Sequence, residues 1–261
     1  MKPHVQNIRS FYAKTIRNLD YDQLKTYHKT ILRKYIYGTN AIEGSQLSEA
    51  EVEAVLTDEV VPKNRPNNDI WSVYNFTRLH EEDLSGPIDI SMIKNIHQIF
   101  TSNIIDRDGK PSKSGEFRTA VVTISGSCHP VSRPDKIERD LAELIRWKEN
   151  AKIDPIELAA IFHARFELIR PFLDFNGRVG RHILNLMLIR EGLPAIYFLP
   201  NQRTAEFFNY RNIVEFVIKR MFISMLHLLS VSSILQILQI MEIVNKEIEN
   251  LFQKAILEDS L

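Results

Sequence analysis

The chain has 261 residues, of which 44% are hydrophobic and 25% are charged, a composition typical of a globular protein with a substantial buried core. Its 33 basic residues balance its 33 acidic residues, so composition favours neither nucleic acid nor an anionic membrane surface as a partner. The single cysteine, Cys128, excludes an intramolecular disulfide, and residues 1–14 contain no apolar run of signal-peptide length. We therefore expect a cytoplasmic protein that binds neither nucleic acid nor membrane.

Helix signals dominate the first hundred residues. Ser48, followed three residues later by Glu51, is a capping-box pattern that predicts a helix over the apolar stretch at 52–56. A second helix is predicted at 91–100, where the apolar residues share one helical face: Met92, Ile93, Ile96, Ile99 and Phe100. Between the two helices, the PKNRPNN stretch at 62–68 favours a linker.

One segment has the pattern of a β-strand. Residues 119–125, TAVVTIS, are rich in β-branched side chains and are followed by Gly126. Since the rest of the chain reads as helix, this strand favours a flap on the surface rather than the centre of a sheet.

Two further helices are predicted on either side of a short loop. Asp154 before Pro155 is a strong helix start, and the helix should stop before Pro171, because the residue preceding a proline is disfavoured in helical geometry. The next helix should begin after 176–177, Asn-Gly, and run to Glu191. The sequence thus predicts a helix–loop–helix around RPFLDFNG.

The C-terminal part contains an uncharged stretch from Met221 to Met241, which has the length of a membrane span. Seven polar residues interrupt it, so we expect two buried helices that break near 230–233 instead. From Ile234 onward, two sets of apolar residues recur seven apart: Ile234, Met241 and Ile248, and Ile237, Val244 and Leu251. This seam predicts a C-terminal helix that either packs on its own domain or joins two copies in a homo-oligomer.

The loop between the two central helices has the chemistry of a phosphate site. A helix that starts with small residues exposes N–H groups at the positive end of its dipole, and Arg178 and Arg181 lie on one face of that helix. Asp174 precedes it and could hold a magnesium ion that bridges the phosphates. The alternative is an ordinary helix start with solvent-exposed arginines.

His163 and Glu167 lie four residues apart on the preceding helix. They could be two ligands of a metal ion. We expect a packed histidine instead, because a metal site needs three or more ligands.

The stretch HARFELIRPFLDFNGRVGR, residues 163–181, resembles the signature of Fic proteins, H-P-F-x-[D/E]-G-N-G-R-x-x-R. GEFR at 115–118 and the predicted strand after it resemble the flap of this family. Upstream, residues 39–44, TNAIEG, match the family's inhibitory motif, [S/T]-x-x-x-E-[G/N].

The resemblance implies an all-α protein with the Fic fold: a helical core with a short β flap, an N-terminal helical extension and a C-terminal helix. It divides the chain into an N-terminal helical region at 1–87 with the inhibitory motif, a Fic core at 88–229 and a C-terminal helix at 230–261.

The resemblance also implies an activity. Most Fic proteins are adenylyltransferases, which move AMP from ATP to a hydroxyl of a target protein, so the partner would be a protein with a modifiable Ser, Thr or Tyr. By motif position, Asp174 would hold Mg²⁺, and Asn176 and Gly177 would bind the α- and β-phosphates. Arg178 would contact the β-phosphate and Arg181 the γ-phosphate.

Two other regions gain roles from the same resemblance. The flap edge would align the target by strand addition through Val122, Thr123, Ile124 and Ser125. Phe207 and Phe208 stand where the family often has a Tyr-Tyr pair near the nucleotide base, so they would either stack on the base or, as we rather expect, pack within the protein. Glu43 would pair with Arg181 and exclude the γ-phosphate, with Thr39 on the inward face of the same short helix.

Two motif positions depart from the family. The histidine that serves as general base is Arg170 here, and arginine with a pKa above about 12 cannot accept a proton at neutral pH. The first motif glycine is Phe175, which would either take the left-handed conformation and crowd the anion site or take negative φ and point outward. The sequence therefore favours an autoinhibited, impaired adenylyltransferase, with a nucleotide-binding pseudoenzyme and a helical scaffold as alternatives.

Overall fold

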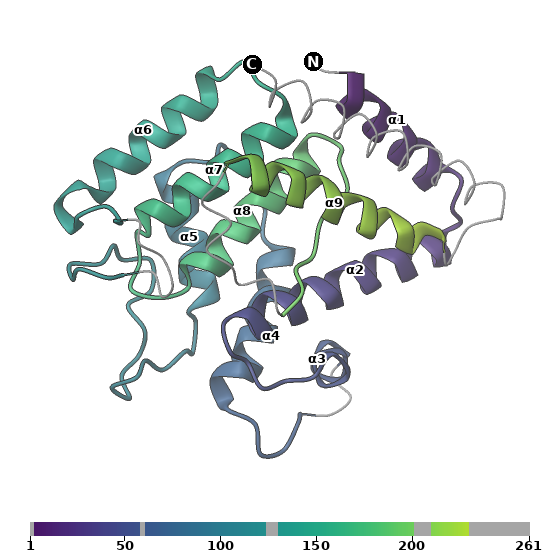
Figure 1. Cartoon of the computed structure of the whole chain (residues 1–261). Coiled ribbons are helices and arrows are strands. Elements are labelled where there is room, and N and C mark those ends of the chain that lie inside the picture. The colour runs from purple at the N-terminus through teal and green to yellow at the C-terminus, as the bar shows by residue number, and fades with distance from the viewer. Residues whose placement is uncertain (1–2, 58–60, 124–129, 201–209, 230–261) are drawn as a thin grey trace.

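The computed structural model describes residues 3–57, 61–123, 130–200 and 210–229. Their regular structure is helical (Figure 1): α1 Pro3–Arg17, α2 Tyr21–Ile42, α3 Glu49–Leu56, α4 Asn67–Glu81, α5 Ile90–Phe100, η1 Pro134–Lys136, α6 Ile137–Asn150, α7 Pro155–Ile169, α8 Asn176–Arg190 and α9 Tyr210–Leu229. Within these ranges there is no β-sheet, and the recorded β-bridge joins Ile105 to Pro111. The prediction of an all-α protein is confirmed.

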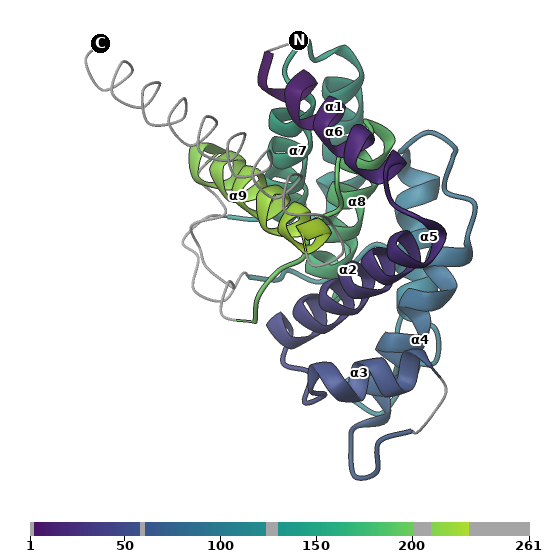
Figure 2. The ribbon, with the colours of Figure 1, turned by 90° about the vertical axis from the view of Figure 1, so that its right-hand side faces the viewer.

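The centre of the molecule is α7, which packs against α6, α8 and α9. Its Phe162 and Phe166 are fully buried, as are Val179 of α8 and Val217 of α9. Figures 1 and 2 show α2 between this group and the pair formed by α3 and α4, and α2 contacts helices on both sides. Helix α2 therefore connects the N-terminal helices to the core.

The predicted helix starts are confirmed where local hydrogen bonds fix them. The Ser48 side chain accepts from the Glu51 N–H at 3.2 Å, and the Glu51 carboxylate accepts from the Ser48 N–H at 2.8 Å. The Asp154 carboxylate accepts from the Ile156 N–H at 2.9 Å, and α7 ends at Ile169, before the proline.

Helix α2 is much longer than the short helix expected around the inhibitory motif. It has 22 residues, begins with a capping box between Asp20 and Gln23, and ends with Glu43 as its C-cap. Gly38 lets the helix approach the segment after α8, because a Cβ at this position would lie 1.8 Å from the Phe198 carbonyl oxygen. The motif thus lies at the buried C-terminal end of a long helix.

The prediction of a strand at 119–125 is wrong for residues 119–123, which are the part of it that the structure describes. Residues 119–123 have no strand partner, and Val121 is 80% exposed. β-branched residues favour a strand only where a neighbouring strand supplies hydrogen bonds and packing, and this fold offers none here. Ile124 and Ser125 lie outside the described residues.

None of the helices in the described ranges is long and apolar enough to cross a membrane. The break predicted near 230–233, the apolar seam of the C-terminal helix and the pair Phe207–Phe208 lie outside those ranges.

Candidate active site

The loop between α7 and α8 is bounded by two residues in the left-handed conformation. Arg170 has φ 47° and ψ 65°, and Phe175 has φ 62° and ψ 5°. Between them, the Asn176 side chain closes the loop by accepting from the Phe172 N–H at 2.9 Å and donating to the Phe172 carbonyl at 2.8 Å. The Asn176 amide is thus used inside the loop, and no side chain caps the start of α8.

Phe175 takes the strained conformation and turns its ring inward. The residue is 4% exposed, and its ring meets His97 edge-on at 6.4 Å between centroids. The guanidinium carbon of Arg178 lies 3.3 Å from the centre of the ring. Of the two conformations that the sequence allowed for Phe175, the structure therefore has the left-handed one, with the ring turned inward. The phenyl group supports an arginine of the motif.

Asp174 lies on the open side of the loop. Its side chain is 71% exposed, accepts from the Phe175 N–H at 2.6 Å and lies 3.7 Å from the Arg178 guanidinium. The described residues contain no group of three or more His, Cys, Asp or Glu that could hold a metal. One accessible carboxylate nevertheless fits Mg²⁺ as nucleotide sites use it, because phosphates and waters complete that coordination.

Arg181 is held by the inhibitory motif. Its Nε donates to the Thr39 hydroxyl at 2.6 Å, and its Nη2 donates to the Glu43 carboxylate at 2.7 Å. The Arg181 side chain is 8% exposed. Gly177 makes room for this pair, since a Cβ there would lie 2.5 Å from the Glu43 carboxylate. The expected contact between Glu43 and Arg181 is therefore present.

Arg170 occupies the position where the family motif has its base. Its Nη1 lies 3.8 Å from the Glu167 carboxylate one turn earlier on α7, and its carbonyl accepts from Arg118 Nε at 2.7 Å. Glu167 and His163 both face Gly180, where an added Cβ would meet them at 2.5 and 3.0 Å. His163 is thus packed between α7 and α8, as predicted.

Glu167 should make stability depend on pH. Burial raises the pKa of this carboxyl from 4.5 to about 7, and the positive charges of Arg170 and Arg181 offset part of the rise. Because the folded-state pKa lies above the unfolded one, the unfavourable contribution is absent below about pH 4.5 and grows as the pH rises to 7. Glu167→Gln should therefore have nearly the same free energy of unfolding as the parent protein at pH 4. At pH 8 it should be more stable than the parent by roughly 3 kcal/mol.

Urea denaturation at both pH values measures this difference. Glu143→Gln changes an exposed carboxylate on α6 and should shift stability by no more than about 0.5 kcal/mol at either pH. A Glu167→Gln effect of the same size at pH 4 and pH 8 would contradict the buried, ionisable carboxyl.

Two residues that the sequence did not single out hold this site together. Arg118 donates to the carbonyls of Arg170, Ala120 and Ser132, which ties residues 118–120 and Ser132 to the end of α7. His97 accepts from the Gly115 N–H at 2.9 Å and stacks on Phe172 with ring centroids 3.8 Å apart. A histidine on the apolar face of α5 was a detectable signal, whereas nothing local marks the contacts of Arg118.

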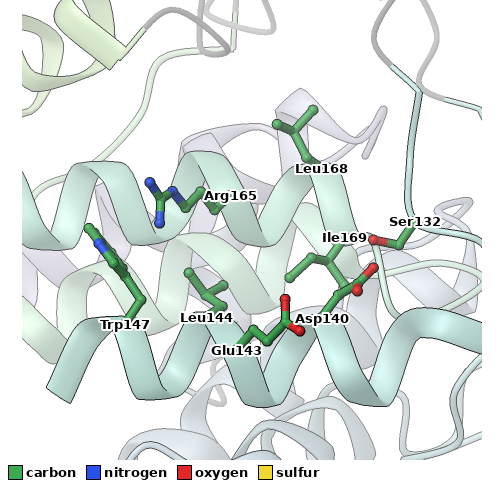
Figure 3. Close-up of a pocket in the computed structure, with 8 residues that line it drawn as sticks. All are labelled: Ser132, Asp140, Glu143, Leu144, Trp147, Arg165, Leu168 and Ile169. Atoms are coloured by element: carbon green, nitrogen blue, oxygen red, sulfur yellow. The ribbon is translucent and has the colours of Figure 1, made fainter. Parts of the chain in front are cut away.

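A surface groove of about 450 Å³ runs between α6 and α7 (Figure 3). Its lining consists of Ser132, Asp140, Glu143, Leu144, Trp147, Arg165, Leu168 and Ile169. The Arg165 guanidinium lies over the Trp147 ring, 4.1 Å from its centre, at one end. At the other end, the Ser132 N–H donates to the Leu168 carbonyl, so the groove begins beside Ser132 and the loop that follows Ile169.

The fold and the loop together define a class: helical domains in which one inter-helix loop presents a carboxylate, an Asn-Gly helix start and two arginines. Residues 87–188 match the family model described as Fic/DOC family. The chain is a member of the Fic/DOC family.

Named relatives support this assignment. The chain is 30% identical over 227 residues to "Protein adenylyltransferase fic-1" of Caenorhabditis briggsae, which covers 79% of this chain and 43% of that protein. It is 33% identical over 201 residues to the protein of the same name from Caenorhabditis elegans, covering 69% and 38%. The match thus spans about two fifths of the length of these relatives. The solved structure of C. elegans Fic-1, residues 134–508, has a TM-score of 0.72 and 23% identity and covers 88% of this chain and 71% of that one.

Proposed function

We propose that this chain is a Fic-type protein adenylyltransferase that is held inactive by Glu43 and strongly impaired by Arg170. The activity would be transfer of AMP from ATP to a Ser, Thr or Tyr hydroxyl of a target protein. One observation carries the proposal: the Arg181 guanidinium donates hydrogen bonds to Glu43 and Thr39, next to the start of α8, which no side chain caps. A γ-phosphate and the Glu43 carboxylate would compete for the same donors.

The nucleotide would lie across the start of α8. Its phosphates would accept from backbone N–H groups at Asn176 and Gly177, with Arg178 and Arg181 at the β- and γ-phosphates. Phe207 would stack on the base. Mg²⁺ held by Asp174 would neutralise phosphate charge when bound.

The target would bind along the flap. Residues 122–123 lie outside regular secondary structure and have no strand partner among the described residues, so their backbone is suited to strand addition by an extended target segment. The groove between α6 and α7, which Ser132 lines at one end, offers a second contact surface for the target.

The reaction needs a proton acceptor that Arg170 does not provide. The target hydroxyl oxygen would form a bond to the α-phosphorus, the bond to the β-phosphate oxygen would break, and pyrophosphate would leave. The hydroxyl proton must pass to a base, and a missing general base costs about 10²- to 10⁴-fold in rate. The neighbouring carboxylate, Glu167, is 13% exposed and faces Gly180, so it is poorly placed to replace the base.

A nucleotide-binding pseudoenzyme is the second candidate. Arg170 and the inward ring of Phe175 favour it, because the first adds positive charge to the pocket and the second supports Arg178 without any catalytic group. In this case the site would bind ATP, and its Glu43–Arg181 pair would set the affinity. A helical scaffold would bind no ATP at all.

Glu43→Gly is expected to lower the Kd for ATP by about 10- to 100-fold, because it removes a carboxylate that competes with the γ-phosphate for Arg181. Calorimetric titration with ATP and Mg²⁺ measures the change. An unchanged Kd would place Arg181 outside the nucleotide site, and no binding by either protein would leave only the scaffold.

Glu191→Gly is a matched control. Glu191 is the C-cap of α8 with nearly the same backbone conformation as Glu43, and it also pairs with an arginine, Arg9, at 2.7 Å. It lies at the opposite end of α8 from the loop. Its removal should leave ATP affinity unchanged.

A further inference from the structure

The guanidinium of Arg170 has no hydrogen-bond partner, although the fold fixes the backbone of this residue. The Arg170 N–H donates to the Phe166 carbonyl at 2.9 Å, and its own carbonyl accepts from Arg118. The side-chain nitrogens donate no hydrogen bond among the residues that the structure describes, and none of them is a buried atom. With its side chain 21% exposed, Arg170 can be reached by a ligand.

The ion pair of Arg170 with Glu167 compensates its charge only in part. Nη1 of Arg170 lies 3.8 Å from the Glu167 carboxylate, which is longer than a hydrogen bond. Burial raises the pKa of Glu167 to about 7, so this carboxyl is only about half ionised at neutral pH. Arg181, by contrast, donates to the Glu43 carboxylate at 2.7 Å. Arg170 can therefore bind an anion while the pair of Glu43 and Arg181 stays intact.

A second positive charge lies beside Arg170. Arg118 is 2% exposed, and its guanidinium donates to backbone carbonyls, among them those of Arg170 and Ala120. Burial and the positive charge of Arg170 lower the pKa of Arg118, so the two guanidinium groups are close enough to repel each other. A ligand with about two negative charges would balance this pair.

A phosphate monoester matches this requirement better than a carboxylate. It carries about two negative charges at pH 7 and offers three acceptor oxygens, whereas a carboxylate carries one charge. The planar guanidinium of arginine binds two such oxygens at once. Arginine is accordingly the usual recognition group for phosphorylated side chains.

The chain next to Arg170 is suited to holding a protein segment. The Arg118 N–H donates to the Pro171 carbonyl at 2.9 Å, so the start of the flap lies alongside the loop. Residues 119–121 are exposed, and residues 119–123 have no strand partner within the described ranges. An extended segment that pairs with this backbone can bring one of its side chains to Arg170.

We propose that Arg170 binds a phosphorylated serine of a partner protein, on an extended segment that pairs with residues 119–123. This binding rests on the proposed function for the flap as the surface that meets the target, but it requires neither ATP nor AMP transfer. Since arginine stands where the motif has its base, the phosphorylated side chain would be held there without being modified.

Fluorescence anisotropy of the full chain with a labelled heptapeptide, Thr-Val-Thr-pSer-Thr-Val-Thr, tests this binding. The phosphopeptide should bind at least about 10-fold more tightly than the same peptide with serine, because charge-assisted hydrogen bonds are the strong ones. The peptide with aspartate in that place should bind more weakly than the phosphopeptide. Inorganic phosphate, at a concentration equal to the Kd of the phosphopeptide, should not displace it, since phosphate lacks the backbone contacts.

Two arginine variants distinguish a specific contact from general positive charge. Arg170→Gln should remove the preference for the phosphopeptide over the serine peptide. Arg133→Gln is the matched control, because Arg133 follows the flap, is 80% exposed and pairs with Asp135 at the surface. It should leave the preference unchanged, and urea denaturation should show that both variants are folded.

Equal affinity of the parent protein for the two peptides, or no binding of either, would overturn the proposal whatever the variants do. Aspartate binding as tight as phosphoserine, displacement by inorganic phosphate, or an equal loss of preference in Arg133→Gln would also overturn it. Calorimetry with ATP in the same buffer is a separate measurement. A protein that binds the phosphopeptide but not ATP would lose the nucleotide site and keep this one, and the reverse result would do the opposite.

Discussion

Arg170→His, introduced together with Glu43→Gly, is expected to raise the rate of AMP transfer about 10²- to 10⁴-fold over Glu43→Gly alone. Histidine restores a group that can accept the hydroxyl proton, and the second substitution frees Arg181 for the γ-phosphate. The backbone should accept the change, since position 170 has φ 47° and histidine is among the residues enriched at positive φ. Covalent label from ATP labelled on the α-phosphate, in the presence of Mg²⁺, measures the rate.

Arg170→Gln in the same background distinguishes the effect of adding a proton acceptor from the effect of removing the positive charge of Arg170. It removes the positive charge and provides no proton acceptor, so it should not raise labelling. Strong labelling by the parent protein or by Glu43→Gly alone would falsify the claim that Arg170 limits the reaction. If Arg170→His stays silent, adding Phe175→Gly tests whether the ring blocks the phosphates.

Phe175→Ala is expected to destabilise the protein by about 3–5 kcal/mol, the usual cost of deleting a buried phenyl group. The ring is 4% exposed and lies under the Arg178 guanidinium, so its loss leaves a hole and removes the support of that arginine. Phe175→Gly should be less destabilising than Phe175→Ala by about 0.5–1 kcal/mol, because glycine relieves the left-handed strain at φ 62°. Urea denaturation of the variants measures both differences.

Tyr21→Ala is the matched control, since this aromatic residue is 76% exposed, and it should change stability by no more than about 0.5 kcal/mol. A Phe175→Ala effect as small as that of Tyr21→Ala would show that the ring does not support the loop. A smaller loss for alanine than for glycine would show that position 175 is unstrained.

Much of the helical structure could be predicted because its determinants are local. The capping box at Ser48 and the start at Asp154 depend on residues within one turn, and both are found as expected. The strand at 119–123 could not be predicted correctly, because β-branched residues form a strand only with a partner. No partner strand is found for these residues. Instead, the side chain of Arg118 holds the chain beside them by donating to backbone carbonyls up to 52 residues away in sequence.

The sequence by itself determined the chemistry available at the loop. It placed an arginine where the motif has its base, because the identity of a side chain fixes its pKa range wherever it folds. Only the tertiary structure decided how those groups are used. Glu43 meets Arg181 across 138 residues because α2 packs on α8, and Phe175 turns inward because His97 of α5 and Arg178 enclose its ring. Both contacts join distant parts of the chain. The family resemblance implied the first of them, whereas nothing in the sequence indicated which residues would enclose the Phe175 ring.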